Sequence, residues 1–194
     1  MTTLHGRAEM NASSDAELLD AMFQQVEPTP EGFRTEIVRG AYFMAPQTDT
    51  HWQIIHRLVR ALEDRFSPKV RVMSDVRIDF PGHLNGFAPD IAKLRDGAGT
   101  DGAGRLRHED VEFIAEVISE STAANDYGPK KAAYATAEVP AYLIVDPYAQ
   151  KWRLFTLPRD GEYRDELTGK FGEPVDLTGT PVDLVLATDE FPVD

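Results

Sequence analysis

The chain has 194 residues, 42% of them hydrophobic and 27% charged, an ordinary globular composition that suffices for one domain with a sizeable core. It contains no cysteine, which excludes disulfides, thiolate metal sites and cysteine nucleophiles. Proteins that bind mainly the phosphate backbone of nucleic acids usually have a net positive charge, whereas the net charge of this chain is −13. Any contact with nucleic acid must therefore rest on a local basic patch of the surface.

The N-terminus and the hydropathy of the chain indicate where the protein works. No cationic flank precedes an apolar core at the N-terminus, and no apolar run approaches the length of a membrane span. We therefore expect no signal peptide, no contact with a membrane and a cytoplasmic location. Residues 1–12 are predicted to be disordered, and residues 13–194 are predicted to form a single domain.

The first half of the chain predicts helices, a hairpin and short strands. Apolar residues spaced by three and four mark two amphipathic helices, and alternation marks the extended segments. Arg39-Gly40 is a hairpin-type turn, and the four glycines between Asp96 and Gly104 favour a mobile loop. The predicted elements are a helix over 13–26, a hairpin over 33–44, a helix over 50–66, strands over 70–80 and 89–94, and the loop over 96–104.

The second half is organised around Asp110–Ser119, which has the pattern of a strand covered on both faces. A carboxylate among apolar neighbours is costly unless it is paired, hydrogen-bonded or bound to a metal, so Glu116 is a candidate functional residue. The period of two places Val111, Phe113, Ala115 and Val117 on one face and Ile114, Glu116 and Ile118 on the other.

The chain then alternates between helix and strand. Pro129 suits the first turn of a helix that runs through Ala137. The short connections and a crossover helix predict Val111–Ser119 and Ala141–Asp146 as neighbouring central strands, so one α/β domain is the simplest interpretation. The remaining predicted elements are a strand over 151–157, a turn near 169–172 and a strand near 182–186.

Three residues could form a catalytic site. Asp90 opens one strand, Glu116 lies inside the next, and Lys130 is one turn into the helix that follows. Two carboxylates on adjacent strands can share a Mg²⁺ ion, which activates a water, and a lysine beside it can orient that water or stabilise developing charge. This division of labour suits phosphodiester hydrolysis, although the spacing of two acids and a lysine also arises by chance.

The motifs around these residues are more specific than their spacing. Together they resemble the Uma2 family of restriction endonucleases, within the PD-(D/E)XK nuclease superfamily, over roughly residues 30–160. Glu36 ahead of Gly40, Met44–Pro46 and His51 at a helix start are also similar to that family. The motifs that carry the resemblance most strongly are Pro89-Asp90, Glu116–Thr122, Asp126–Lys130 with Tyr134, and Val139–Pro147.

The resemblance implies a restriction-endonuclease-like core, with a mixed central β-sheet flanked by helices, and it implies Asp90 and Glu116 as ligands of Mg²⁺ or Mn²⁺. The superfamily's usual lysine lies two residues after the second acid, where this chain has Ile118. The resemblance therefore points to Lys130 on the following helix, and it implies Glu36 as an extra acid near the site.

Several assignments stay open at the level of sequence. Lys131 could replace Lys130 because it lies near the same helix face. Glu36 could instead be an exposed hairpin residue, and His51 could either face substrate or serve as a polar residue at a helix N-terminus.

Three functions compete. The first is a Mg²⁺-dependent endonuclease acting on DNA, with a homodimer as one option. The second is a regulatory or binding protein on a nuclease fold, which the acidic charge favours. The third is a scaffold in which the acids pair with Arg95, Arg105 or Arg107.

Overall fold

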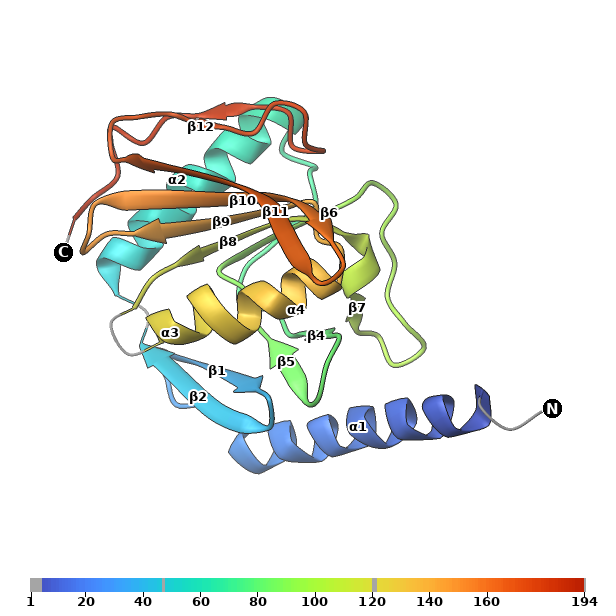
Figure 1. Cartoon of the computed structure of the whole chain (residues 1–194). Helices are drawn as coiled ribbons and strands as arrows, with labels where there is room; N and C mark the ends of the chain where they lie inside the picture. The colour runs from blue at the N-terminus through green and yellow to red at the C-terminus, as the bar shows by residue number, and fades with distance from the viewer. Residues whose placement is uncertain (1–4, 47, 120–121, 194) are drawn as a thin grey trace.

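A mixed six-stranded sheet forms the centre of the protein (Figure 1). The computed structural model describes residues 5–46, 48–119 and 122–193, and side chains from residue 15 onward. The strand order of the central sheet is β11-β10-β9-β8-β6-β3. In this sheet β8 and β9 are parallel, whereas the other neighbouring strands are antiparallel. The strands are β3 (Val72–Met73), β6 (Ile91–Leu94), β8 (Val111–Val117), β9 (Ala141–Asp146), β10 (Lys151–Arg159) and β11 (Glu162–Lys170).

A second sheet of five strands lies beside the first, in the order β2-β1-β5-β4-β7. A third pairing joins two short strands near the C-terminus. The strands of the second sheet are β1 (Phe33–Val38), β2 (Ala41–Pro46), β4 (Ile78–Phe80), β5 (Asn85–Phe87) and β7 (Leu106–Arg107), and the C-terminal pair is β12 (Val175–Asp176) and β13 (Val185–Leu186).

Helices cover both faces of the central sheet (Figure 1). On one face, α2 and the C-terminal segment pack against Phe113, Ala115 and Val117. On the other face, α4 and the second sheet pack against Ile114 and Ile118. The helices are α1 (His5–Val26), α2 (Asp49–Phe66), η1 (His108–Asp110), α3 (Ala123–Asn125), the π-helical turn η2 (Asp126–Lys130) and α4 (Lys131–Thr136).

The predicted centre of the fold is confirmed. β8 and β9 pair in parallel from Phe113 opposite Ala141 to Val117 opposite Val145, and η2 and α4 form the crossover between them. The hairpin over β1 and β2 turns at Arg39 and Gly40, whose φ angles of 51° and 77° are those that a two-residue hairpin turn requires.

The structure departs from the predicted strands in three places. The segment 70–80 is two strands in different sheets, because the chain turns at Asp75, where φ is 56°. Val111 lies on the α4 face because Lys93 pairs with Phe113 and Leu94 with Val111, which leaves Glu112 as a bulge. β11 was missed because most of its residues are polar and exposed, so no apolar alternation marks it.

At the N-terminus, α1 begins at His5, upstream of the predicted start at residue 13. The disorder proposed for residues 1–12 stays a prediction, and residues 1–4 lie outside the described part of the chain. Within that described part, no helix has both the length and the apolar character needed to cross a membrane.

Candidate active site

The face of the central sheet that is turned toward α4 holds a group of buried charged side chains. Each is at most 9% exposed. They come from β1, the residue before β6, β8 and η2, so the group joins both sheets and the crossover helix. This ionic cluster consists of Arg34, Glu36, Asp90, Glu116, Asp126 and Lys130.

Strand geometry explains how these residues meet. Arg34 and Glu36 are two apart on β1, so their side chains leave the strand on the same face. Ile91 pairs with Ala115 in antiparallel register, which places Asp90 across from Glu116. The second acid therefore faces the first, as the sequence predicted, and β1 adds a cation and an acid from the neighbouring sheet.

Lys130 reaches Glu116 from the crossover. Its Nζ lies 2.7 Å from Glu116 Oε1, 3.0 Å from Glu36 Oε1 and 3.0 Å from Asp126 Oδ1. Tyr134, one turn further, donates its hydroxyl to Glu116 Oε1 at 2.6 Å. Lys131 points elsewhere, because its Nζ lies over the Phe155 ring, 4.3 Å from the centroid. The geometry thus favours Lys130 over Lys131 as the lysine of this cluster.

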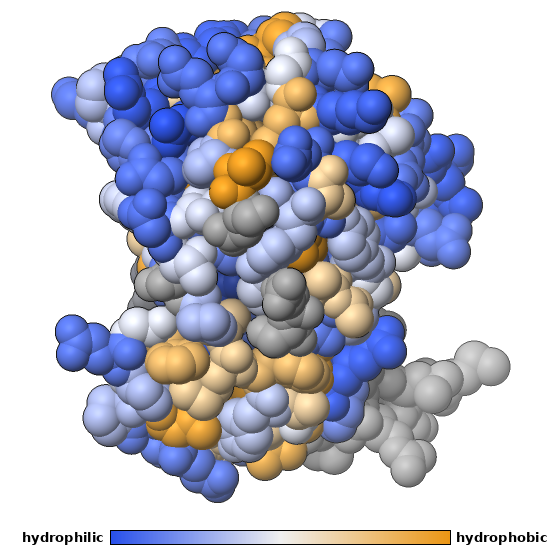
Figure 2. Space-filling view, turned by 90° about the vertical axis from the view of Figure 1, so that its left-hand side faces the viewer, coloured by the Kyte–Doolittle hydropathy of each residue, from blue (hydrophilic) through white to orange (hydrophobic). Residues whose placement is uncertain are grey.

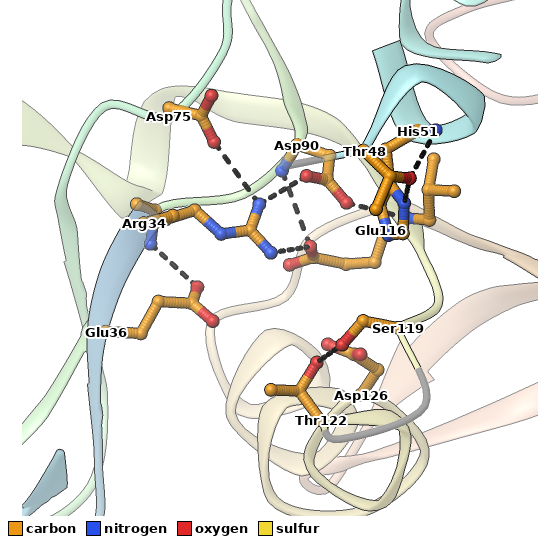
Figure 3. A network of polar contacts seen from close by, with 12 residues as sticks. Arg34, Glu36, Thr48, His51, Asp75, Asp90, Glu116, Ser119, Thr122 and Asp126 are labelled. Atoms are coloured by element: carbon orange, nitrogen blue, oxygen red, sulfur yellow. Dashed lines mark hydrogen bonds and ion pairs between the residues drawn. The ribbon is translucent and has the colours of Figure 1, made fainter. Parts of the chain in front are cut away.

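Arg34 is the member that sequence reasoning missed. Figure 3 shows its guanidinium between the carboxylates of Asp75, Asp90 and Glu116. It donates a short hydrogen bond to Asp90 and a 3.3 Å bond to Asp75, and its Nη2 is 3.8 Å from Glu116 Oε2. The available signal was its position two residues before Glu36 on a hairpin strand, which puts both side chains on one face.

Backbone groups fix the two facing acids. The Val117 N–H donates to Asp90 Oδ2 at 2.7 Å, and the Asp90 N–H donates to Glu116 Oε2 at 3.4 Å. The Ala88 N–H also donates to Glu36 at 2.9 Å. These bonds hold the carboxylates in place without using up all of their oxygen lone pairs.

Four acids and two cations share this buried space, so acids are in excess. Burial raises the pKa of Glu116 to about 8 against the opposing effect of Lys130, and the neighbouring carboxylates of Asp126, Asp90 and Glu36 add to the rise. Burial likewise raises the pKa of Asp126. Glu36 differs, because Lys130 and Arg34 outweigh its burial and lower its pKa.

The same acids fix the charge of Lys130. Burial acts to lower the pKa of its ammonium group, but Asp126, Glu116 and Glu36 outweigh burial and raise that pKa well above the ordinary value. A lysine that stays protonated cannot act as a general base. It can stabilise negative charge that develops nearby or orient a water.

The donor chemistry of Asp90 and Glu116 fits a hard divalent cation. Mg²⁺ prefers one or two carboxylates, with waters and substrate phosphate oxygens completing its shell. Among residues 5–46, 48–119 and 122–193, no three acidic or histidine groups are arranged to hold a metal. The two acids instead converge on the Arg34 guanidinium, which stands in for a cation at that position.

His51 lies beside the cluster. It is buried at the start of α2, and its Nδ1 is 2.8 Å from the Oγ1 of the N-cap residue Thr48. It also lines a hollow of about 290 Å³, so it is a helix N-terminal residue that also borders a hollow. Asp75 belongs to this hollow and to the partners of Arg34, so the hollow adjoins the cluster. Its lining residues are Thr48, Asp49, His51, Trp52, Ile55 and Asp75.

One open alternative is wrong, and another is wrong in the arginines that it named as partners. Glu36 is 4% exposed, so it is not an exposed hairpin residue. The scaffold hypothesis paired the acids with Arg95, Arg105 or Arg107, but Arg95 and Arg107 bind Asp110 and Arg105 binds Asp101 and Asp20. Asp90 and Glu116 take Arg34 and Lys130 as partners instead.

Comparisons with known proteins identify the family and the fold. The family described as "Uma2: Putative restriction endonuclease" matches residues 20–189. The fold is similar to the crystal structure of "a putative nuclease belonging to DUF820" from Anabaena variabilis ATCC 29413, with a TM-score of 0.69 and 15% identity over 89% of this chain and 96% of that one. At this identity the likeness shows a shared fold. No curated protein sequence gives a significant match.

Proposed function

The chain belongs to the Uma2 family, and from this membership we propose that it is a divalent-metal-dependent endonuclease that hydrolyses phosphodiester bonds in DNA. The observation that carries the proposal is the convergence of Asp90 and Glu116 on one cation position, with Lys130 Nζ 2.7 Å from Glu116. Structural ion pairs are rarely built with an excess of buried acid, because each uncompensated charge is costly.

Each residue of the cluster has a role in this proposal. Asp90 and Glu116 would hold Mg²⁺ or Mn²⁺, which supplies a Lewis acid and lowers the pKa of a bound water. Lys130 would stabilise the negative charge that grows on the phosphate oxygens as the bond to the leaving group breaks. Glu36 and Asp126 position the Lys130 ammonium through their contacts at 3.0 Å.

The hollow adjoins the cluster through Asp75, and we propose it as the side from which the substrate would approach. Trp52 is 57% exposed there, which suits stacking on a nucleobase. Stacking depends less on positive charge than backbone contacts do, and this matters in a protein with a net charge of −13. We propose DNA as the substrate on the family's description as restriction endonucleases.

The homodimer and the cytoplasmic location stay predictions. Exposed Phe33, Tyr42 and Met44 lie on β1 and β2, and Figure 2 shows hydrophobic surface over the end of the molecule where these strands lie. β2 ends the order of its sheet among the described strands, so its outer edge could pair with a second copy.

A regulatory or binding protein on the same fold is the second candidate. Arg34 already neutralises part of the charge on Asp90 and Glu116, and the acidic surface opposes the approach of nucleic acid. Both observations would hold in a protein that binds a partner without cutting DNA.

A cleavage assay separates the two candidates. Plasmid and single-stranded DNA are incubated with Mg²⁺ or Mn²⁺ and with wild type, Asp90→Asn, Glu116→Gln, Lys130→Met or Lys131→Ala. The first three variants should lose about 10²-fold or more of the rate, the scale of removing one group that stabilises transition-state charge. Lys131→Ala is the matched control and should stay near wild type, because its side chain packs on Phe155.

Melting curves of each variant distinguish lost chemistry from lost folding. If wild type cleaves nothing with either metal, the binding-protein candidate replaces the nuclease. If Lys131→Ala is the inactive lysine variant, the assignment of Lys130 is overturned.

A further inference from the structure

Arg34 has an unusual set of partners for a buried arginine. Its side chain is 9% exposed and comes from the second sheet, yet its contacts are with Asp75, Asp90 and Glu116 on the chain segments around the central sheet. Its Nε atom is buried and lacks a hydrogen-bond partner among the described residues. The guanidinium therefore contacts the acids through its two terminal nitrogens, while its Nε–H donor makes no hydrogen bond to the described residues.

The oxygens that Arg34 contacts are the ones that a metal would need. One of its terminal nitrogens donates to Asp90, and the other lies 3.8 Å from Glu116. A divalent cation at hard oxygen ligands requires distances near 2.1 Å, for which the guanidinium must leave the space between the two carboxylates. A metal ion and a guanidinium held between the same two carboxylates would also repel each other strongly.

Asp75 gives the displaced side chain a place to go. It contacts the Arg34 Nη1 at 3.3 Å, its side chain is 31% exposed, and it lines the hollow beside the cluster. A small outward movement would keep the Asp75 contact and turn the guanidinium toward that hollow. There it could meet a phosphate, the group that a guanidinium binds with paired hydrogen bonds.

We propose that Arg34 is a tethered counter-ion: it holds Asp90 and Glu116 together in the metal-free protein, and it moves toward Asp75 and a phosphate of the substrate when a divalent cation binds. This rests on the proposed function, because it assigns a role relative to the metal of that site. Arg34 is thus a positioning residue, and its presence between Asp90 and Glu116 sets how tightly the metal binds.

Metal affinity tests the proposal without nucleic acid or cleavage. Calorimetry measures Mn²⁺ binding to wild type, Arg34→Met, Arg34→Lys and the matched control Arg105→Met, which removes an arginine from a distant ion-pair group. Arg34→Met should bind Mn²⁺ about 5- to 150-fold more tightly, the usual range for coupling between two binding events. The Mn²⁺ affinity of Arg34→Lys should lie between those of wild type and Arg34→Met, because a compact ammonium cannot span both acids. The affinity of Arg105→Met should match that of wild type.

Two failures are distinguishable in this experiment. If wild type binds Mn²⁺ but Arg34→Met binds it equally or more weakly, the role of Arg34 is overturned and the nuclease proposal stands. If neither wild type nor any variant binds Mn²⁺, the metal site fails, and the role of Arg34 fails with it.

A rescue experiment separates occupancy of the site from the simple loss of a nearby charge. Arg34→Ala leaves space for a small cation, so added methylguanidinium should weaken Mn²⁺ binding to this variant, whereas tetramethylammonium at equal ionic strength should not. Wild type should respond equally to both salts. If both salts act alike on Arg34→Ala, Arg34 acts only as a distant charge and the proposal is overturned.

Discussion

Two groups of ion pairs in this protein have similar composition and opposite surroundings. The ionic cluster has two cations and four acids, none more than 9% exposed. A second group, the rim cluster, lies where α1 meets β4 and β7, and its side chains are 23–44% exposed. The rim cluster consists of Arg77, Arg105, Asp20, Asp79 and Asp101.

The difference shows that burial determines how strongly an ion pair affects stability and the pKa values of its members. Water and salt screen the rim cluster, so its pairs contribute little to stability. In the ionic cluster each charge depends on its partners, and the excess of acid raises the pKa of Glu116. Such an arrangement is costly for folding, and this cost is the reason to propose the ionic cluster as the functional site.

Removing one cation from each group should give the largest contrast. Lys130→Met leaves three carboxylates without their shared partner and should lower the free energy of unfolding by about 3–5 kcal/mol. Arg105→Met should lower it by less than about 1 kcal/mol. Urea denaturation of both variants measures the free energy of unfolding. Equal decreases in the two variants would mean that burial does not make the ionic cluster differ from the rim cluster.

Binding of nucleic acid should also distinguish the two groups. Trp52→Ala removes the exposed ring beside the ionic cluster and should weaken binding of a single-stranded oligonucleotide about 5- to 150-fold, the range for losing one stacked base. Fluorescence anisotropy in the Glu116→Gln background measures affinity without cleavage. Arg105→Met is the control from the rim cluster. If it weakens oligonucleotide binding as much as Trp52→Ala does, the proposed binding of the substrate beside the ionic cluster is contradicted.

The pH dependence of stability tests the environment of Glu116. The pKa of Glu116 is raised from 4.5 to about 8 in the folded protein, so between these values the folded state holds more protons than the unfolded state. Stability therefore falls as pH rises through this window, and the raised pKa of Asp126 acts in the same direction.

Melting with a chelator present, at about pH 5.5 and about pH 8.5, tests this sign. Wild type should lose more of its melting temperature between these two pH values than Glu116→Gln, which cannot titrate. Asp101→Asn is the rim control and should behave as wild type, because hydrogen bonds donated by Arg105 lower the pKa of Asp101, which already titrates below the window. A melting temperature of wild type that rises with pH would contradict the environment described for Glu116.

Part of this site was predictable because it depends on local pattern. Period-two alternation showed that Glu116 lies inside a covered strand, and the motifs around Asp90 and Lys130 identified its companions before any contact was known. The neighbouring strands β8 and β9 followed from the short crossover between them.

Tertiary structure alone decided the rest. The rotation of the π-helical turn η2 aims Lys130 at Glu116 while Lys131 packs on Phe155. Arg34 joins the cluster because a strand of the second sheet crosses the site, and nothing local to β1 reveals that packing. Side-chain alternation is a property of neighbouring residues and can be read along the chain, whereas the partner of a buried charge is set by contacts between distant segments, which no single stretch of sequence contains.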